Sequence, residues 1–294
     1  MAAPVTRAAL LDEGRALLKA AGVETPLLDA RLLLVSALGL DALALLAAPE
    51  AVIEPALAEQ ARTCFARRAA HEPVGRILGE REFRGLRFRL SAGTLEPRPD
   101  SEVVVEAALE AVETRRNAPL QLLDLGTGTG CLLIALLAEL PAASGTGVDL
   151  SADALATART NAALNNVAGR SAFIQANWLS GLVGPYDLVI SNPPYIARAE
   201  IEQLAPEVRL HDPVVALDGG EDGLDAYRQL AKSLPPVLAR DAIVVLEIGA
   251  GQADDVTALF ADAGFLKVGE RADLGGHVRG LVFNLSTDLR GAGQ

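Results

Sequence analysis

One short run, Asn192-Pro193-Pro194-Tyr195, combines a carboxamide, two prolines and an aromatic ring directly after the apolar stretch 187–191. The side-chain oxygen of Asn192 and the carbonyl of Pro193 can accept hydrogen bonds from both N–H groups of a planar NH2 group. The prolines have a fixed φ and no N–H, so they would present that carbonyl rigidly. Tyr195 offers a flat face for stacking. The run therefore predicts a clamp for an amide or exocyclic amine, although Asn-Pro pairs also occur in surface turns.

A nitrogen of this kind is a weak nucleophile, because its lone pair is delocalised into a π-system. Orientation in line with an electrophile would be the main task of the site, and it can contribute roughly 7 to 11 kcal/mol. No general base is required before attack, since the nitrogen becomes more acidic as the new bond forms. We therefore interpret Asn192, Pro193 and Tyr195 as catalytic, and we expect Pro194 to join them in binding the substrate.

A glycine-rich turn lies between a strand-like segment and a helical one, and it consists of Gly126, Thr127, Gly128, Thr129 and Gly130. Glycines let the backbone pass close to a ligand, and the free N–H groups at the start of a helix favour a negative group. Such a turn fits a dinucleotide as well as S-adenosylmethionine, whose carboxylate could take the place of a phosphate. Asp124, ahead of the turn, is expected to order it rather than to contact the ligand.

Asp149 ends the next strand-like segment, about twenty residues after the turn, where a carboxylate can accept hydrogen bonds from both ribose hydroxyls. The alternative is a cap on the following helix, which Ser151 could provide instead. Trp178, the single tryptophan, follows the third strand-like segment. We expect it to stack on adenine or to enclose it, with a core aromatic as the alternative. With Asn192, these residues and the glycine turn make up the predicted cofactor site.

Alternating strand-like and helical segments surround these motifs and predict a doubly wound α/β fold with a mostly parallel sheet. Because such folds bind ligands at the carboxyl ends of their strands, the alternation would bring the turn, Asp149 and the clamp to one edge. The last two strands flank Gly275-Gly276 and are predicted to pair antiparallel. The strand-like segments are 120–125, 144–150, 171–176, 187–191, 242–248, 266–270 and 280–285.

Two further regions precede the α/β domain, which we expect to span 97–288. Residues 1–78 have helical periodicity interrupted at glycines and prolines, which predicts a small all-helical N-terminal domain. Residues 79–96 contain apolar and charged residues that alternate around Gly85, which predicts a β-hairpin linker. Eight arginines lie between Arg62 and Arg89. We expect them to form a solvated helix face and a polar hairpin, with an acidic partner as the alternative.

Composition limits the classes of function. The 294 residues include 26 Lys and Arg against 38 Asp and Glu, and the net charge of −12 argues against direct nucleic-acid binding. Cys64 and Cys131 are far apart and lack metal-ligand spacing, so we expect no metal site and a reducing, cytoplasmic compartment. Charged residues interrupt the leucine-rich stretch 27–46 and the N-terminal apolar run, so neither a membrane span nor a signal peptide is expected.

The combined motifs resemble those of the HemK-like peptide chain release factor N5-glutamine methyltransferases, a class I S-adenosylmethionine-dependent family. The resemblance covers nearly the whole chain. Besides the glycine turn and the clamp it rests on Glu72-Pro73, 76–79, Phe83, Pro97-Arg98-Pro99, 206–209, His211-Asp212-Pro213, 216–220, 222–224 and 246–249.

The resemblance implies a seven-stranded sheet, S-adenosylmethionine as the cofactor without a metal, and S-adenosylhomocysteine as the product. It also implies that the N-terminal domain, 1–78, recognises the substrate. It also implies that the methyl acceptor is the glutamine of a Gly-Gly-Gln tripeptide in release factors, held by the clamp. Two departures stand out. Arg84 replaces a residue that is usually aromatic, and Asp100-Ser101-Glu102 replaces Glu-Thr-Glu. For His211 we favour a role in ordering its loop over one as proton acceptor.

Three other classes share some of these features. A nucleic-acid methyltransferase acting on an exocyclic amine would need the same clamp, but it would flip a base and normally carry a basic domain. A non-catalytic S-adenosylmethionine-binding scaffold would be expected to have lost the clamp. A nicotinamide-dependent oxidoreductase could use the glycine turn, but the chain shows no hydride-transfer site.

Overall fold

The computed structural model describes residues 5–286 and divides into two compact units. One unit contains the N-terminal helices up to Glu80 together with Ala205–His211, and the other contains Arg81–Leu204 and the chain from Asp212 onward. The outer ends of the expected first and last domains, 1–4 and 287–288, lie outside the described residues.

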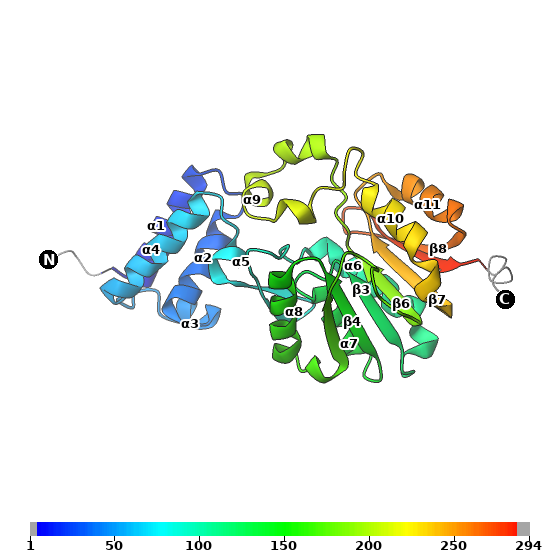
Figure 1. Ribbon diagram of the computed structural model, residues 1–294. Coiled ribbons are helices and arrows are strands. Elements are labelled where there is room, and N and C mark those ends of the chain that lie inside the picture. The colour runs from blue at the N-terminus through cyan, green and yellow to red at the C-terminus, as the bar shows by residue number, and fades with distance from the viewer. Residues whose placement is uncertain (1–4, 287–294) are drawn as a thin grey trace. The chain divides into compact units, whose positions relative to one another are not determined.

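The first unit is helical (Figure 1). Thr6 and Asp41 cap helices by accepting hydrogen bonds from the N–H groups of Ala9 and Ala44. Pro26 begins the second helix, where its missing N–H costs nothing. Buried leucines and the buried ring of Phe65 form the core. The helices are α1 (Arg7–Ala20), α2 (Pro26–Leu38), α3 (Ala42–Ala47), α4 (Pro55–Ala69), α5 (Val74–Leu78) and the short α9 (Pro206–Arg209).

A buried ion-pair network stabilises this unit. The Arg68 guanidinium lies 2.7 Å from the carboxylate of Asp29 and 3.1 Å from that of Glu207, and His71 also contacts Glu207 at 3.2 Å. The expectation of a solvated arginine face is therefore wrong for Arg68, of which only 8% is exposed. Burial of its charge is tolerable because two carboxylates offset it.

A β-hairpin and a seven-stranded sheet define the second unit. The hairpin strands are β1 (Glu80–Phe83) and β2 (Leu86–Arg89), with Phe83 and Phe88 buried. The order in the sheet is β5-β4-β3-β6-β7-β9-β8, and β9 runs opposite to the other six strands. This confirms the predicted fold class and the antiparallel final pair. The sheet strands are β3 (Gln121–Leu125), β4 (Ser144–Asp149), β5 (Ser171–Gln175), β6 (Tyr186–Ser191), β7 (Leu238–Glu247), β8 (Phe265–Ala272) and β9 (Val278–Leu285).

Helices cover both faces of the sheet, as Figure 1 shows. One apolar core lies beneath α6 (Glu102–Ala111), α7 (Cys131–Glu139) and α8 (Ala152–Leu164), and a second lies beneath α10 (Asp225–Ser233) and α11 (Ala253–Asp262). Because both faces of the parallel sheet are buried, the sequences of its strands are continuous apolar runs. Short 3-10 turns lie at 99–101, 198–203 and 214–216.

The strand order reverses between β3 and β6, which makes this pair the switch point of the sheet, where doubly wound folds bind ligands. Leu125 is in register with Ser191. The Ser191 hydroxyl also donates a hydrogen bond to the Leu125 carbonyl at 2.7 Å. The residues that follow these two strands, the glycine turn and the clamp, therefore begin side by side. Among residues 5–286, no helix is both long and apolar enough to cross a lipid bilayer.

Candidate active site

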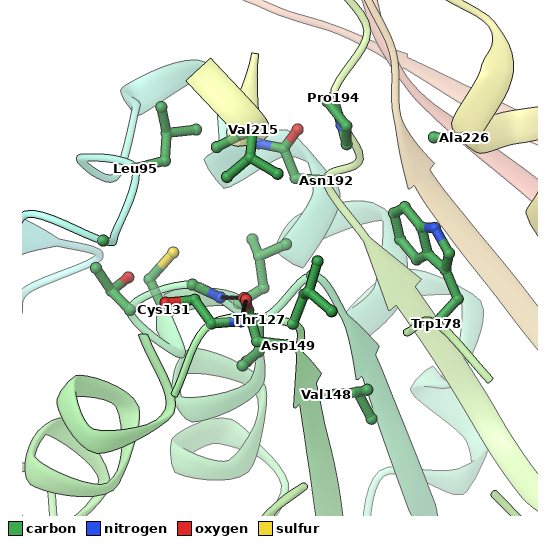
Figure 2. Close-up of a pocket in the computed structure, with 18 of the residues that line it drawn as sticks. Leu95, Thr127, Cys131, Val148, Asp149, Trp178, Asn192, Pro194, Val215 and Ala226 are labelled. Carbon is green, nitrogen blue, oxygen red and sulfur yellow. Dashed lines mark hydrogen bonds between the residues drawn. The ribbon is translucent and has the colours of Figure 1, made fainter. Parts of the chain in front are cut away.

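A cavity of about 490 Å³ opens at the switch point, entirely within the second unit. Its size falls in the range of small-molecule sites. Figure 2 shows Asp149, Trp178 and Asn192 around one common space. Eight of the predicted site residues line the cavity: Gly126, Thr127, Gly128, Thr129, Asp149, Trp178, Asn192 and Pro194. Gly130, Pro193 and Tyr195 are not part of its wall.

The glycine turn has a backbone that disfavours other residues. Gly126 and Gly128 have φ values of 74° and 54°, which L side chains rarely adopt. A Cβ on Gly128 would meet no atom within 4 Å, so it would project into open space beside the cavity. The N–H groups of Gly126 and Thr127 both donate to the Val148 carbonyl at 2.9 Å, which ties the turn to β4. The turn is thus a cradle whose space a side chain would fill.

Asp124 lies beneath the turn and is fully buried. The Thr127 hydroxyl donates to one of its carboxylate oxygens at 2.6 Å, and the other oxygen has no hydrogen-bond partner. Burial raises the pKa of Asp124 to about 7. Its place below the turn, away from the cavity wall, agrees with a supporting role.

Asp149 faces the cavity from the end of β4. One carboxylate oxygen accepts the Gly128 N–H and the other accepts the Ser151 N–H, each at 2.9 Å. Ser151 caps α8 by accepting the Ala154 N–H at 3.2 Å, so Asp149 is not needed for that task. Each oxygen of Asp149 keeps a lone pair for a further donor, such as a ribose hydroxyl.

Trp178 follows β5 and reaches the cavity from an unusual backbone conformation, with φ of 51°. Part of its side chain packs against the apolar core between the sheet, α10 and α11. One edge of its ring would lie 3.9 Å from a Cβ on Gly126. The indole therefore stands close to the glycine turn, as an adenine-binding ring would.

The clamp follows β6. The side-chain nitrogen of Asn192 donates a hydrogen bond to the Ser101 hydroxyl oxygen at 3.3 Å, which leaves the side-chain oxygen of Asn192 available as an acceptor. The Tyr195 carbonyl accepts a hydrogen bond from the Gln252 side chain at 3.0 Å. Burial raises the pKa of Tyr195 to about 12, so its phenol is neutral at physiological pH and is not a base.

Several residues of the cavity wall were not predicted as site residues from the sequence. They come from the segment after the hairpin and from the chain between β6 and α10: Leu95, Glu96, Pro97, Arg98, Ser101, Val215, Ala216, Asp218, Asp225, Ala226 and Gln229. Pro97-Arg98-Pro99 and 216–220 belong to the family motifs, which was the one signal for them. Arg98 forms an ion pair with the buried carboxylate of Asp212, which anchors the first of these segments.

The residues of this cavity fit S-adenosylmethionine: a glycine-rich turn, a carboxylate at the next strand end and a tryptophan beside them. Within residues 5–286, no group of three or more His, Cys, Asp or Glu side chains is arranged to hold a metal ion. Fold and site together define a class I S-adenosylmethionine-dependent methyltransferase. Residues 103–218 match the family model described as the methyltransferase small domain, and residues 9–79 match that of the PrmC N-terminal domain.

Relatives narrow this class to a family. The chain is 49% identical to the release factor glutamine methyltransferase of Bradyrhizobium diazoefficiens, over 88% of each chain. It is 45% identical to that of Agrobacterium fabrum, over 95% of this chain and 97% of the relative. The protein belongs to the release factor glutamine methyltransferase family, as the motifs predicted.

A solved methyltransferase from Pyrococcus furiosus shares the fold. The TM-score is 0.51 at 16% identity, and the match covers 76% of this chain and 96% of that one.

Proposed function

We propose that this enzyme transfers the methyl group of S-adenosylmethionine to the side-chain amide nitrogen of a release-factor glutamine within Gly-Gly-Gln. The observation that carries the proposal is the position of Asn192. Its carboxamide lines the cavity at the switch point, and its nitrogen is engaged by Ser101, so its oxygen remains to accept an N–H of the substrate. The names of the relatives supply the acceptor class, since both are release factor glutamine methyltransferases.

When bound, S-adenosylmethionine supplies a methyl group made electrophilic by its sulfonium. The protein would contribute position and electrostatics. Asn192 and the Pro193 carbonyl would each accept one N–H of the glutamine, and this aims the nitrogen at the methyl carbon. Pro193 is buried, and neither Pro193 nor Tyr195 lines the cofactor cavity. The Pro193 carbonyl and Tyr195 would therefore contact the glutamine on the side of the clamp that faces away from the cavity. The proton leaves after methyl transfer, when the nitrogen is acidic, and needs no dedicated base.

The glycine turn, Asp149 and Trp178 would hold the cofactor. The turn would receive the methionyl carboxylate at its backbone N–H groups. Asp149 would accept from the ribose hydroxyls, and Trp178 would lie against adenine. Release factors would be the protein partners, and the enzyme would then act in the cytoplasm, where translation ends. The net charge of −12 gives no support to the nucleic-acid alternative.

The acceptor is identified by offering the enzyme several substrates at once. Purified release factor, bulk RNA and bulk DNA are incubated in parallel with labelled S-adenosylmethionine, and the methyl group is mapped by mass spectrometry. We expect label on the Gly-Gly-Gln glutamine alone. A release factor with that glutamine changed to alanine is the matched control and should remain unlabelled. Label on nucleic acid only would refute the proposal.

A further inference from the structure

A buried carboxyl group that the proposed chemistry does not use lies beside the clamp. Glu247 is the last residue of β7, and Leu246 before it is in register with Ser191 of β6. Glu247 therefore ends β7 beside the point where Asn192 leaves β6. Only 2% of Glu247 is exposed. Asn192 thus has a buried acidic residue as its neighbour at the carboxyl edge of the sheet.

Burial raises the pKa of Glu247, and the nearby Ser101 and Asn192 side chains oppose that rise. Since Asn192 also donates to the Ser101 oxygen, these three residues form one polar group, which we call the Asn192 network. The second carboxylate oxygen of Glu247 is buried without a hydrogen-bond partner. The nearby cation Arg279 is engaged by the Asp273 carboxylate at 3.0 Å. A buried acid with an unsatisfied oxygen is costly, so its presence at the clamp calls for a functional reason.

The Asn192 network has one consistent polarity when Glu247 is ionised. A carboxylate accepts hydrogen bonds and cannot donate them. The Ser101 oxygen accepts from Asn192, so its single hydroxyl proton is available for the Glu247 carboxylate. The NH2 group of Asn192 must then face these two residues, and its oxygen faces away from them. If the Asn192 amide were flipped, its oxygen would face the Glu247 carboxylate and its NH2 group would face the NH2 group of the substrate. Both contacts would be repulsive.

We propose that Glu247, together with Ser101, is a positioning residue that fixes the Asn192 amide with its oxygen toward the methyl-accepting nitrogen. This rests on the proposed function, because it takes Asn192 as the acceptor in the clamp. The end of β7 is held separately: the Tyr227 hydroxyl donates to the main-chain carbonyl of Glu247 at 2.9 Å. Substitution of the Glu247 side chain therefore perturbs the network and leaves this anchor in place.

Steady-state kinetics on the full-length enzyme test the proposal. Glu247→Leu removes every acceptor and is expected to lower kcat about 100-fold, whereas Glu247→Gln keeps one acceptor oxygen and should lose about tenfold. KM for the release factor should change less than about threefold, because the network acts on the orientation of Asn192. The Kd for S-adenosylmethionine, measured by calorimetry, should change as little. Tyr227→Phe is the matched control for the strand end and should retain kcat within about twofold.

A double-mutant cycle separates positioning from a merely structural effect. In an Asn192→Ala background, Glu247→Leu should cause no further loss of kcat, because the residue to be positioned is gone. Wild-type kcat in Glu247→Leu, or losses that multiply in the double variant, would overturn the proposal. If the wild-type enzyme labels an acceptor other than release factor, the proposed function fails, and the same cycle run on that acceptor still decides whether Glu247 positions Asn192.

A readout that needs no acceptor comes from nuclear magnetic resonance. The side-chain NH2 signals of Asn192, assigned through their loss in Asn192→Ala, should exchange slowly with water in the wild type and in Tyr227→Phe. They should exchange faster in Glu247→Leu. Equal exchange in all three proteins would contradict the network.

Discussion

The carboxylate of Asp149 accepts the backbone N–H of Gly128 at 2.9 Å, so the end of β4 and the glycine turn after β3 hold each other in place. The same carboxylate faces the cavity, where the ribose is expected. One side chain therefore shapes the turn, and we expect it to present acceptors to the cofactor as well. This dual role determines how the residue should be tested, because its removal would disturb the turn as well.

Asp149→Asn keeps the shape of the side chain and one acceptor oxygen but removes the charge. Hydrogen bonds to charged groups contribute about 1.5 to 3 kcal/mol, so we expect the Kd for S-adenosylmethionine to rise about 10- to 100-fold. Isothermal titration calorimetry measures this directly. The control is Asp187→Asn, since Asp187 lies at the opposite, amino end of β6 and accepts from the Gln121 N–H. Unchanged affinity of Asp149→Asn for S-adenosylmethionine would show that Asp149 does not bind the cofactor.

The single tryptophan makes cofactor binding visible. Because Trp178 is the only tryptophan of the chain and lines the cavity, S-adenosylhomocysteine should quench most of the intrinsic tryptophan fluorescence as it binds. Trp178→Ala should weaken binding about tenfold through lost stacking, and Trp178→Phe should weaken it less. If calorimetry shows saturation while the emission of the wild type stays constant, Trp178 does not contact the adenine.

The stability of the helical unit depends on Arg68. Arg68→Ala would leave the buried Asp29 carboxylate without its guanidinium, and we expect a loss of about 3 to 5 kcal/mol in the free energy of unfolding. Arg62→Ala is the matched control, because Arg62 pairs with Glu13 at the surface and should cost at most about 1 kcal/mol. Urea denaturation followed by circular dichroism compares the two. Equal losses would mean that burial does not distinguish the pairs.

Those parts of the site that follow from local chemistry could be predicted from the sequence. The glycine turn, Asp149 and Asn192 each stand at the end of an apolar strand, and parallel strands bring their carboxyl ends to one edge. The fold class was predictable for the same reason, since the alternation of strands and helices leaves few topologies.

The rest depended on packing between segments far apart in the chain. Ser101 and Glu247 reach Asn192 from different elements, and no periodicity places them there. The orientation of the clamp could not be predicted from the sequence either. Successive residues of an extended run point in different directions, so Pro194 lines the cavity while Pro193 and Tyr195 do not. The burial of Arg68 could not be predicted, because the carboxylates that pair with it, Asp29 and Glu207, are far from it in the sequence.

The clamp itself is tested by Asn192→Ala and Asn192→Asp. Removal of one oriented hydrogen-bonding group at a reaction centre typically costs about 100- to 1000-fold in kcat, and we expect a loss of that size for Asn192→Ala, with cofactor affinity largely retained. Asn192→Asp keeps the shape but cannot donate to Ser101, and it brings a second carboxylate toward Glu247. It should therefore be as inactive as the alanine variant. Single-turnover measurements with saturating cofactor report the methyl-transfer step, and near wild-type rates in Asn192→Ala would exclude the clamp.

The pH dependence of stability follows from the two buried acids. Burial raises the pKa of Glu247 and of Asp124 to about 7, from ordinary values of 4.5 and 3.8. Their folded-state pKa values lie above the unfolded ones, so the folded protein binds more protons in between. Their contribution to stability is fully present below about pH 4 and is lost as the pH rises through about 7. We expect urea denaturation to show a stability that falls between pH 5 and 8 on this account.

Glu247→Gln isolates one of these groups. A neutral amide carries no charge to desolvate, so the variant should gain stability relative to the wild type as the pH rises, on the order of 1 to 3 kcal/mol at pH 8. The difference between the two proteins should shrink toward pH 5, where Glu247 is protonated. A difference that is constant with pH would show that Glu247 titrates outside this range.

Activity should respond in the opposite direction. The Asn192 network requires the carboxylate form of Glu247, so wild-type kcat should rise as the pH increases through about 7, while kcat of Glu247→Gln should be flat across that range. The ionisable groups that face Glu247 are Asp100, Cys131, Tyr195, Tyr227 and Arg279. Burial holds the pKa of Cys131 and of Tyr195 at about 12, and that of Tyr227 well above its usual value, so none of these three titrates near pH 7. A kcat profile that remains sloped in Glu247→Gln would assign the titration to another group. If kcat of Glu247→Gln does not change with pH and this variant is also more stable than the wild type at pH 8, then Glu247 destabilises the fold. The enzyme would retain it because the clamp needs its charge.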